Sequence, residues 1–257
     1  MLYVYGIVGA PSFETIPGEG HEADDIVPVT CGAFAAAVSA LSSRIIAATP
    51  QSVWRHERVL EHLMQDYTVL PLRFGTISPD TDALEALLLH STSEILSDLE
   101  RVRDKVEIAL RIAAGKQSVE SPGIYPERGR VPYPQPTQAV PPLLAAANDR
   151  EPAGRGAAYL RARLQHHHGE TAREDGAKRL AQLLRQSLDT VLQDVVCTPA
   201  DASESYRISC LVERVRVPAF ADALARFRAD HPQLDVTCTG PWPPYSFMAA
   251  APLAGRS

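Results

Sequence analysis

The run from His166 to His168 is the part of this sequence that most resembles a metal site. Successive side chains on a helix diverge by about 100°, so three histidines in a row cannot converge on one ion. A structural zinc site also needs four ligands at set spacings, often including cysteine, and no cysteine is close in the sequence. The run therefore predicts solvent-exposed histidines on a helix or turn, with no bound metal.

A second apparent metal pattern, "HERVLEH", begins at His56 and ends at His62. The zinc protease motif HExxH requires two histidines four residues apart, on one helix face. Here the separation is six residues, which places the two rings about 240° apart around a helix. The pattern does not predict a zinc site. Glu57 and Glu61 lie one helical turn apart and can support Arg or His neighbours across turns.

Other motifs that carry chemistry are missing from the sequence. The stretch "GIVGAP", residues 6–11, has too few glycines for a dinucleotide loop, and neither GxxxxGK[ST] nor GxSxG occurs. We therefore expect no enzyme, no cofactor and no catalytic, cofactor-binding or metal-ligating residues. Carboxylate pairs are defined in space rather than in sequence, so an enzyme or small-ligand-binding protein remains the alternative.

The four cysteines, Cys31, Cys197, Cys210 and Cys238, form no CxxC pair. A chain of 257 residues is long enough to build a core without disulfides. Reduced thiols are the rule in proteins of the cytoplasm. The pattern therefore predicts four reduced, mostly buried thiols in a cytoplasmic protein.

Composition favours a soluble globular protein that binds neither nucleic acid nor a lipid membrane. Hydrophobic residues make up 45% of the chain and the net charge is -6. Nucleic-acid binders usually carry a dense basic face, and the nearest candidate, "RGR" at residues 128–130, is interpreted as a solvated linker. No apolar run reaches the ~18 residues of a membrane span, and the first residues lack the basic start of a signal peptide.

The N-terminal third mixes strand and helix patterns. Residues 2–8, "LYVYGIV", form a buried-strand pattern that ends at a Gly-Ala-Pro stop. Weaker strand candidates are "DIVPVTC" and "AFAAAVSAL", and the second fits a short helix equally well. Residues 52–67 have the spacing of an amphipathic helix. The following "TVLPLRFGTI" has strand composition, and Pro71 places it at a sheet edge or on a bulge.

One long helix is expected over residues 78–102. Ser78 is the expected N-cap, Pro79 fits the first helical position, and Asp80 and Asp82 favour the positive end of the helix. One apolar stripe supports this helix and consists of Leu84, Leu87, Leu88, Ser91, Ile95, Leu99 and Val102.

The second half of the chain follows a β-α-β-β-α-β order. Its expected elements are a half-buried strand at 105–112, a helix continuing through 177–196, a possible short strand at 195–197, a strand at 205–215, a helix at 217–230 and a strand at 234–242. This is the order of a ferredoxin-like sandwich.

Together these patterns predict an α+β fold with two domains. The first, residues 1–103, is a mixed α+β domain, and the second, residues 104–250, is ferredoxin-like. A Pro-rich loop at 120–152 is inserted into the second domain, since residues 121–152 contain 8 of the 21 prolines. Residues 251–257 are expected to form a flexible tail.

Three aromatic residues, Trp242, Tyr245 and Phe247, stand among prolines in "TGPWPPYSFM" near the end of the chain. Residues before proline are held in extended conformations, so a stiff, extended segment at a sheet margin is expected. The aromatic rings either pack the segment onto the domain, which we favour, or face a partner. Arg73 poses a similar choice between a paired charge inside the first domain and an exposed contact.

Several ordered segments resemble the gas vesicle protein GvpL/GvpF family. "HERVLEHLM" followed by "VLPLRFGTI", and the closing "GPWPPYSF", are similar to its signatures. "YVYGIV", "AAYLRAR" and "VEIALRI" also resemble that family at the expected places. Each motif is weak alone, but the resemblance covers nearly the whole chain in the same order.

The resemblance implies a non-enzymatic, minor accessory protein of gas vesicle formation, associated with the vesicle in the cytoplasm. It implies contact with the small, very hydrophobic shell subunit GvpA and with other accessory proteins, and two α+β domains of which the second is ferredoxin-like. No catalytic residue is carried over, and no partner-binding residue maps to a numbered position.

A shell subunit with one apolar face exposes that face before assembly, and such surfaces aggregate. A soluble partner could cover the face or template the first ribs. Strand addition at an open sheet edge is one hypothesis, and apolar contact through a helix face or groove is the other.

Overall fold

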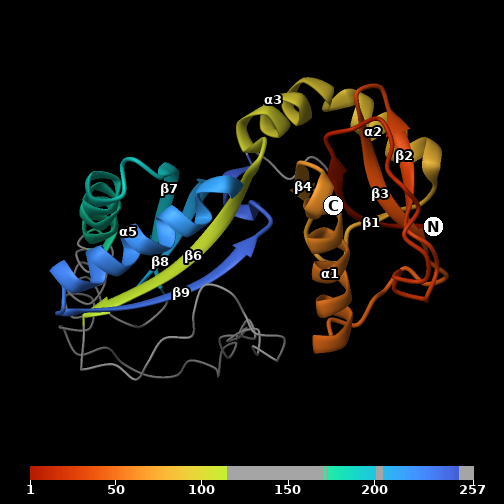
Figure 1. Ribbon diagram of the computed structural model, residues 1–257. Helices are drawn as coiled ribbons and strands as arrows, with labels where there is room; N and C mark the ends of the chain where they lie inside the picture. The colour runs from red at the N-terminus through yellow and green to blue at the C-terminus, as the bar shows by residue number, and fades with distance from the viewer. Residues whose placement is uncertain (115–170, 172, 201–204, 249–257) are drawn as a thin grey trace, which may run out of the picture.

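The computed structural model describes residues 1–114, 171, 173–200 and 205–248, which form two lobes with one antiparallel sheet in each (Figure 1). The first lobe contains β1 (Leu2–Val8), β2 (Val27–Cys31), β3 (Phe34–Ala40), α1 (Pro50–Asp66), β4 (Val69–Pro71), β5 (Ile77–Ser78), α2 (Thr81–His90) and α3 (Thr92–Val102). The second contains β6 (Lys105–Ala114), a helix whose described part ends at residue 187, β7 (Leu192–Pro199), β8 (Ser205–Glu213), η1 (Arg214–Arg216), α5 (Val217–Asp230), β9 (Leu234–Trp242) and η2 (Tyr245–Phe247). The α+β class expected from the sequence is thus confirmed.

The first sheet is covered on both faces. Its strand order is β2-β3-β1-β4, and β5 also pairs with β1. Tyr3 and Tyr5 on β1 belong to the same apolar cluster as the inner face of α1. Val4 and Ile7 belong to a second cluster, with the inner faces of α2 and α3. The apolar run of residues 2–8 is therefore a buried strand, as the sequence predicts.

Helix α1 forms where the sequence predicts a helix and begins with a reciprocal capping box. The Thr49 hydroxyl accepts from the Ser52 backbone N–H at 3.1 Å, and the Ser52 hydroxyl accepts from the Thr49 N–H at 3.0 Å. Pro50 occupies the first turn, where no N–H is needed. The buried face of α1 consists of His56, Val59, Leu60, Leu63 and Met64.

The strand expected over "TVLPLRFGTI" is instead two strands separated by a turn. β4 ends at Pro71, and the Thr76 N–H donates to the Arg73 carbonyl at 3.1 Å. Gly75 has φ +85°, a conformation that glycine adopts without steric cost. The edge position expected from Pro71 is confirmed, because β4 ends the sheet.

The single helix expected over residues 78–102 is also wrong, because it breaks at Ser91 into α2 and α3. The Thr92 hydroxyl donates to the Leu88 and Leu89 carbonyls at 3.1 and 3.0 Å, which is one local alternative to regular helix bonding. Asp80, not Ser78, is the N-cap, since its carboxylate accepts from the Ala83 N–H at 2.8 Å.

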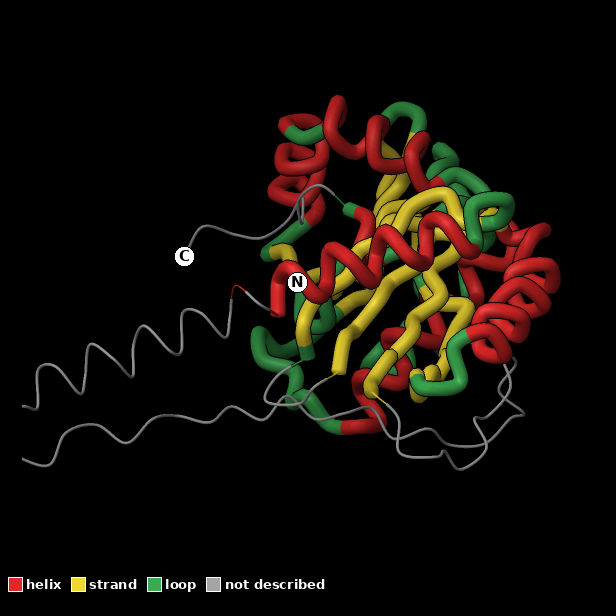
Figure 2. Tube along the Cα trace, turned by 90° about the vertical axis from the view of Figure 1, so that its left-hand side faces the viewer, coloured by secondary structure: helices red, strands yellow, loops and turns green. Residues whose placement is uncertain are grey.

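The second sheet has strand order β7-β8-β6-β9, with antiparallel neighbours throughout. Its helices pack on one face, where Phe220 and Leu224 of α5 share a cluster with Ile108 and Leu110 of β6. Figure 2, turned toward this lobe, shows a helix crossing the strands. The alternation expected for residues 105–112 and the inward face of α5 are both confirmed.

The helix expected to continue through residue 196 ends earlier, at residue 187. Val195 and Cys197 alternate with exposed residues and join strand β7 instead, opposite β8. Three expected features lie outside the described residues, namely the Pro-rich loop at 120–152, the run His166 to His168 and the tail at 251–257.

Candidate functional site at the junction of the two sheets

A short segment after β9 connects the two sheets. We call residues 243–248 the strap. The Ser246 N–H and hydroxyl donate to the two carboxylate oxygens of Glu107 on β6, at 2.9 and 2.8 Å. The Ser246 and Ser209 hydroxyls are 2.8 Å apart. Glu107 is only 7% exposed, so its charge is solvated largely by the strap and not by water.

The strap then reaches the first sheet through Tyr245, which lies against α1. Its hydroxyl donates to Oε1 of Glu57 at 3.1 Å and lies 3.2 Å from Nε2 of His56. These partners are 188 and 189 residues away in the sequence. The last described residues of the chain are thereby tied to its first helix.

Phe247 packs on the other side of the first sheet. It is 3% exposed and belongs to the cluster that includes Leu72, which follows β4, and Leu84 and Leu88 of α2. Trp242 is half-buried and donates from Nε1 to the Thr239 hydroxyl at 3.2 Å. Of the three aromatic residues, Phe247 is therefore a core residue, Tyr245 is a hydrogen-bonded contact at the junction, and Trp242 is peripheral.

The extended path expected for this segment holds only in part. β9 continues through Trp242 at the edge of its sheet, as expected. The chain then turns, because Tyr245–Phe247 is a short 3-10 helix. The turn places Tyr245 and Phe247 on different sides of the first sheet, which a straight segment could not do.

A directed hydrogen-bond chain runs through His56. The Gly75 N–H donates to the Tyr3 hydroxyl at 3.1 Å, and the Tyr3 hydroxyl lies 2.8 Å from Nδ1 of His56. Nε2 of His56 lies 3.0 Å from the Leu72 carbonyl, which can only accept. Nε2 therefore carries the proton, and Nδ1 accepts from Tyr3.

Burial shifts the pKa of three side chains on the α1 side of this junction. It lowers the pKa of fully buried His56 to about 4, although the hydrogen bond to the Leu72 carbonyl partly opposes this shift. It raises the pKa of Glu57 to about 7, although the bond from Tyr245 acts in the opposite direction. Burial also raises the pKa of Tyr3, which stays a protonated donor.

The rings around His56 form a cluster of edge-to-face and stacked contacts. Tyr3 and Tyr5 have ring centroids 4.7 Å apart, and the His21 ring lies 4.3 Å from that of Tyr3. Phe74 closes the cluster at 5.9 Å from the His56 ring. This arrangement stabilises the fold, and the His56 ring has no exposed surface.

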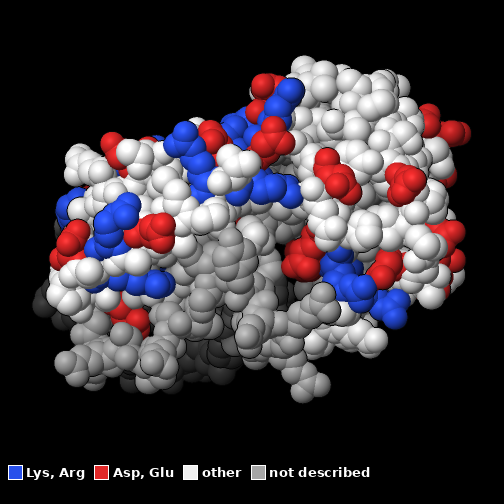
Figure 3. All heavy atoms as spheres, viewed as in Figure 1, with Lys and Arg blue, Asp and Glu red and all other residues white. Residues whose placement is uncertain are grey.

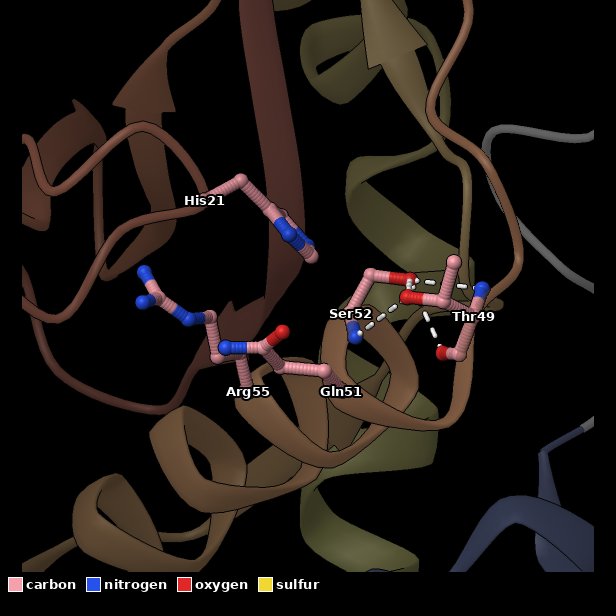
Figure 4. Close-up of a pocket in the computed structure, with 5 residues that line it drawn as sticks. All are labelled: His21, Thr49, Gln51, Ser52 and Arg55. Carbon is pink, nitrogen blue, oxygen red and sulfur yellow. Dashed lines mark hydrogen bonds between the residues drawn. The ribbon is translucent and has the colours of Figure 1, made fainter.

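A shallow hollow lies near the start of α1, lined by His21, Thr49, Gln51, Ser52 and Arg55 (Figure 4). The Ser52 hydroxyl donates to the Ala47 carbonyl at 2.6 Å and caps the helix, so no base activates it. Arg55 donates from Nη1 to the Gly20 carbonyl at 3.0 Å. The hollow therefore has polar walls but no nucleophile paired with a base.

The four thiols are free, as the sequence predicts, and three of them are buried. Burial raises the pKa of both Cys197 and Cys238 to about 11. Such thiols are protonated at neutral pH and poor nucleophiles. Within the residues that the structure describes, no group of three His, Cys, Asp or Glu side chains could hold a metal ion.

Charge is mixed on the face seen in Figure 3, where each lobe carries both acidic and basic side chains. Arg73 is exposed, which favours the second of the two roles considered for it. None of the described helices is long and apolar enough to cross a membrane.

Sequence reasoning singled out the strap aromatics and His56 but could not bring them together. Glu107 was missed as a junction residue because it occupies an outward position in an alternating strand. Its buried environment comes from the strap, which is 139 residues away. The signal available in the sequence was a cluster of aromatic residues among prolines, in a chain with only 6% aromatic residues.

Comparison with known families gives a match over nearly the whole chain. The family model described as "Gas vesicle synthesis protein GvpL/GvpF" matches residues 1–249. Gas vesicle protein F of Streptomyces sp. (strain CB03234) is 28% identical over 249 residues, which are 96% of this chain and 98% of the relative. Gas vesicle protein L of the same strain is 30% identical over 208 residues, 76% of this chain and 68% of the relative.

Two solved structures share the fold. The gas vesicle protein GvpF from Anabaena sp. PCC7120 superposes with a TM-score of 0.66 at 17% identity, covering 97% of this chain and 96% of the other. GvpF from Microcystis aeruginosa gives a TM-score of 0.66 at 18% identity, covering 97% and 99%.

Proposed function

Because this chain belongs to the GvpL/GvpF family of gas vesicle synthesis proteins, we propose that it binds the hydrophobic shell subunit GvpA and assists nucleation or assembly of the vesicle wall. The observation that carries this proposal is the family match over residues 1–249. The family is a gas vesicle family and not a known enzyme family. The protein acts through its surfaces, in the cytoplasm and at the vesicle, together with other accessory proteins.

The β2 edge of the first sheet is the contact surface that we favour for GvpA. The opposite edge, β4, lies next to the strap, whereas β2 ends the sheet order and Val27 on it is 38% exposed. An edge strand presents unpaired backbone groups that a partner strand can use without sequence-specific pockets. Strand addition there would let a small soluble protein hold an aggregation-prone subunit.

We propose further that the second lobe is a ferredoxin-like domain of residues 104–250, joined to an N-terminal domain of residues 1–103. The element order from β6 to β9 and the sheet order β7-β8-β6-β9 support this assignment. That fold hosts many activities, so it adds nothing to the functional argument.

A binding experiment tests the proposed function. Purified protein mixed with GvpA should co-elute with it on a sizing column and lower the light scattering of the mixture. Val27→Lys should weaken this binding by about tenfold, because a charge on an edge strand opposes strand pairing. Val196→Lys is the matched control, since Val196 is also 38% exposed and lies on β7, an edge of the other sheet.

A gene deletion tests the proposed role in vesicle formation. Deleting the gene should abolish buoyancy, and the wild-type gene should restore it. Normal vesicles in the deletion strain, or no contact with GvpA at micromolar concentrations, would contradict the proposal.

A further inference from the structure

The strap meets α1 through one ionisable carboxyl group. Glu57 is partly buried, and the Tyr245 hydroxyl donates to its Oε1 at 3.1 Å. The same hydroxyl lies 3.2 Å from Nε2 of His56, which carries the ring proton, so Tyr245 accepts from the ring and donates to the carboxyl group. The hold of the strap on the first helix therefore includes a side chain whose charge changes with pH.

The basic side chains of α1 do not neutralise Glu57. Arg55 and Arg58 are both bonded to the loop between β1 and β2, the first through a backbone carbonyl and the second through an ion pair. Glu61 lies one turn further along the helix, and its like charge raises the pKa of Glu57. The helix thus opposes ionisation of this carboxyl group.

The other elements at this contact also supply no cation that pairs with Glu57. Tyr3 of β1 is a protonated phenol, and His56 is neutral above about pH 4. Arg73, in the turn after β4, forms no ion pair with Glu57 in the described part of the chain. On the strap, Tyr245 is the only titratable residue. Ionisation of Glu57 therefore places a charge at the contact that hydrogen bonding alone must compensate.

The sign of the effect follows from the pKa of Glu57. Burial raises it from 4.5 to about 7 while the strap is seated. When the strap lifts from α1, water reaches the carboxyl group and the pKa falls back toward 4.5. Seating therefore takes up a proton between these two values, so it is favoured at low pH and weakens as pH rises to 7. Above pH 7 both states are ionised and the balance changes no further.

The strap can leave α1 without breaking a sheet. The ladder of β9 ends at Trp242, before the strap begins. The backbone bonds of the strap from Tyr245 to Pro243 at 2.8 Å and from Phe247 to Pro244 at 3.1 Å are internal to it. The bonds from Ser246 to Glu107 lie within the second lobe. The strap can thus stay on the second lobe while it separates from the first.

We propose that the strap is a pH-sensitive latch between the two lobes, which ionisation of Glu57 releases and protonation of Glu57 seats. Release withdraws Phe247 from its cluster with Leu84 and Leu88, because only Ser246 separates it from Tyr245. The apolar surface uncovered in this way is of the kind that contacts other proteins. The inference goes beyond the proposed role in vesicle formation and does not depend on binding of the shell subunit.

Nuclear magnetic resonance of the full-length protein tests this inference. Labelling with 15N-phenylalanine gives six amide signals, one for each phenylalanine, and Phe247→Leu identifies that of Phe247. Between pH 5.5 and 7.5 this signal should move toward the position of a released chain. The ratio of released to seated strap should rise by up to about tenfold per pH unit and level off above pH 7.

Two variants show whether Glu57 is the group responsible. Glu57→Gln stays neutral and its amide still accepts from Tyr245, so the Phe247 signal should keep its low-pH position throughout. Glu14→Gln is the matched control, because Glu14 is exposed, and it should titrate as the wild type does. Glu61→Gln removes the like charge, so release should level off at a lower pH and at a smaller extent than in the wild type.

Three results would overturn the inference. One is a Phe247 signal that does not move with pH in the wild type, and another is an equal movement in Glu57→Gln. The third is an equal movement of the Phe220 and Phe227 signals, which belong to the core of the second lobe and report unfolding rather than release. If Glu57→Gln fails to fold, Glu61→Gln decides, and an unchanged pH of levelling counts against the latch.

Discussion

At the scale of single residues, His56 and Glu57 have opposite linkage to pH. Glu57 has a pKa raised from 4.5 to about 7, so the folded protein binds a proton that the unfolded chain releases. Its contribution to stability is present below pH 4.5 and is lost as pH rises to 7. His56 has a pKa lowered from 6.5 to about 4, so its contribution is present above pH 6.5 and is lost as pH falls to 4.

These two effects oppose each other between pH 4.5 and 6.5, and one substitution separates them. Glu57→Gln leaves the linkage of His56 uncompensated, so the free energy of unfolding should rise with pH more steeply than in the wild type. The added slope is at most about 1.4 kcal/mol per pH unit, the value for one proton. Urea denaturation at three pH values across this window measures it.

Glu14→Gln is the control for this experiment, since Glu14 is exposed and lies outside the hydrogen bonds described for the junction. Its slope should match that of the wild type. Equal slopes for Glu57→Gln and the wild type would mean that Glu57 is not buried by the strap in solution.

At the scale of elements, the strap aromatics should differ in their effect on stability. Phe247→Ala removes a buried ring and should cost about 3–5 kcal/mol, with a fall in melting temperature of roughly 2–4 °C per kcal/mol. Trp242→Ala removes a half-buried ring with one hydrogen bond and should cost much less. Calorimetry of the two variants compares them directly. The reverse order would contradict the core position of Phe247.

At the same scale, sequence patterns predicted some helices and strands and missed others. Residues 2–8 could be predicted from a continuous apolar run with a clear stop, and residues 52–67 and 217–230 from apolar residues at helical spacing. The break at Ser91 could not, because the apolar stripe runs through it unchanged and the break depends on local hydroxyl bonding. For the same reason the sequence could flag the strap but not its partners, since tertiary contacts over 188 residues leave no periodic signal.

At the scale of the whole molecule, the two sheets are joined by one covalent connection, by the strap and by apolar contacts such as that of Leu211. The covalent connection is residues 103–104, between α3 and β6, and Asp104 has φ +55° there. A chain truncated after Trp242 would keep this connection but lose the bonds from Ser246 and Tyr245. Its radius of gyration by small-angle X-ray scattering should exceed that of the full chain.

The truncated chain should still show the secondary structure of both sheets by circular dichroism, which separates loss of the junction from unfolding. An unchanged radius of gyration would mean that direct sheet-to-sheet packing, for example through Leu211, is sufficient to hold the two lobes together.

The position of Phe247 also has a consequence for synthesis on the ribosome. Phe247 fills a cluster between the first sheet and α2 whose other members, such as Leu84 and Leu88, are translated long before it. A nascent chain therefore keeps an unfilled apolar gap in its first lobe until the strap has been translated. Products that stop before the strap retain that gap, which gives chaperones and proteases a physical means to distinguish them from molecules that contain Phe247.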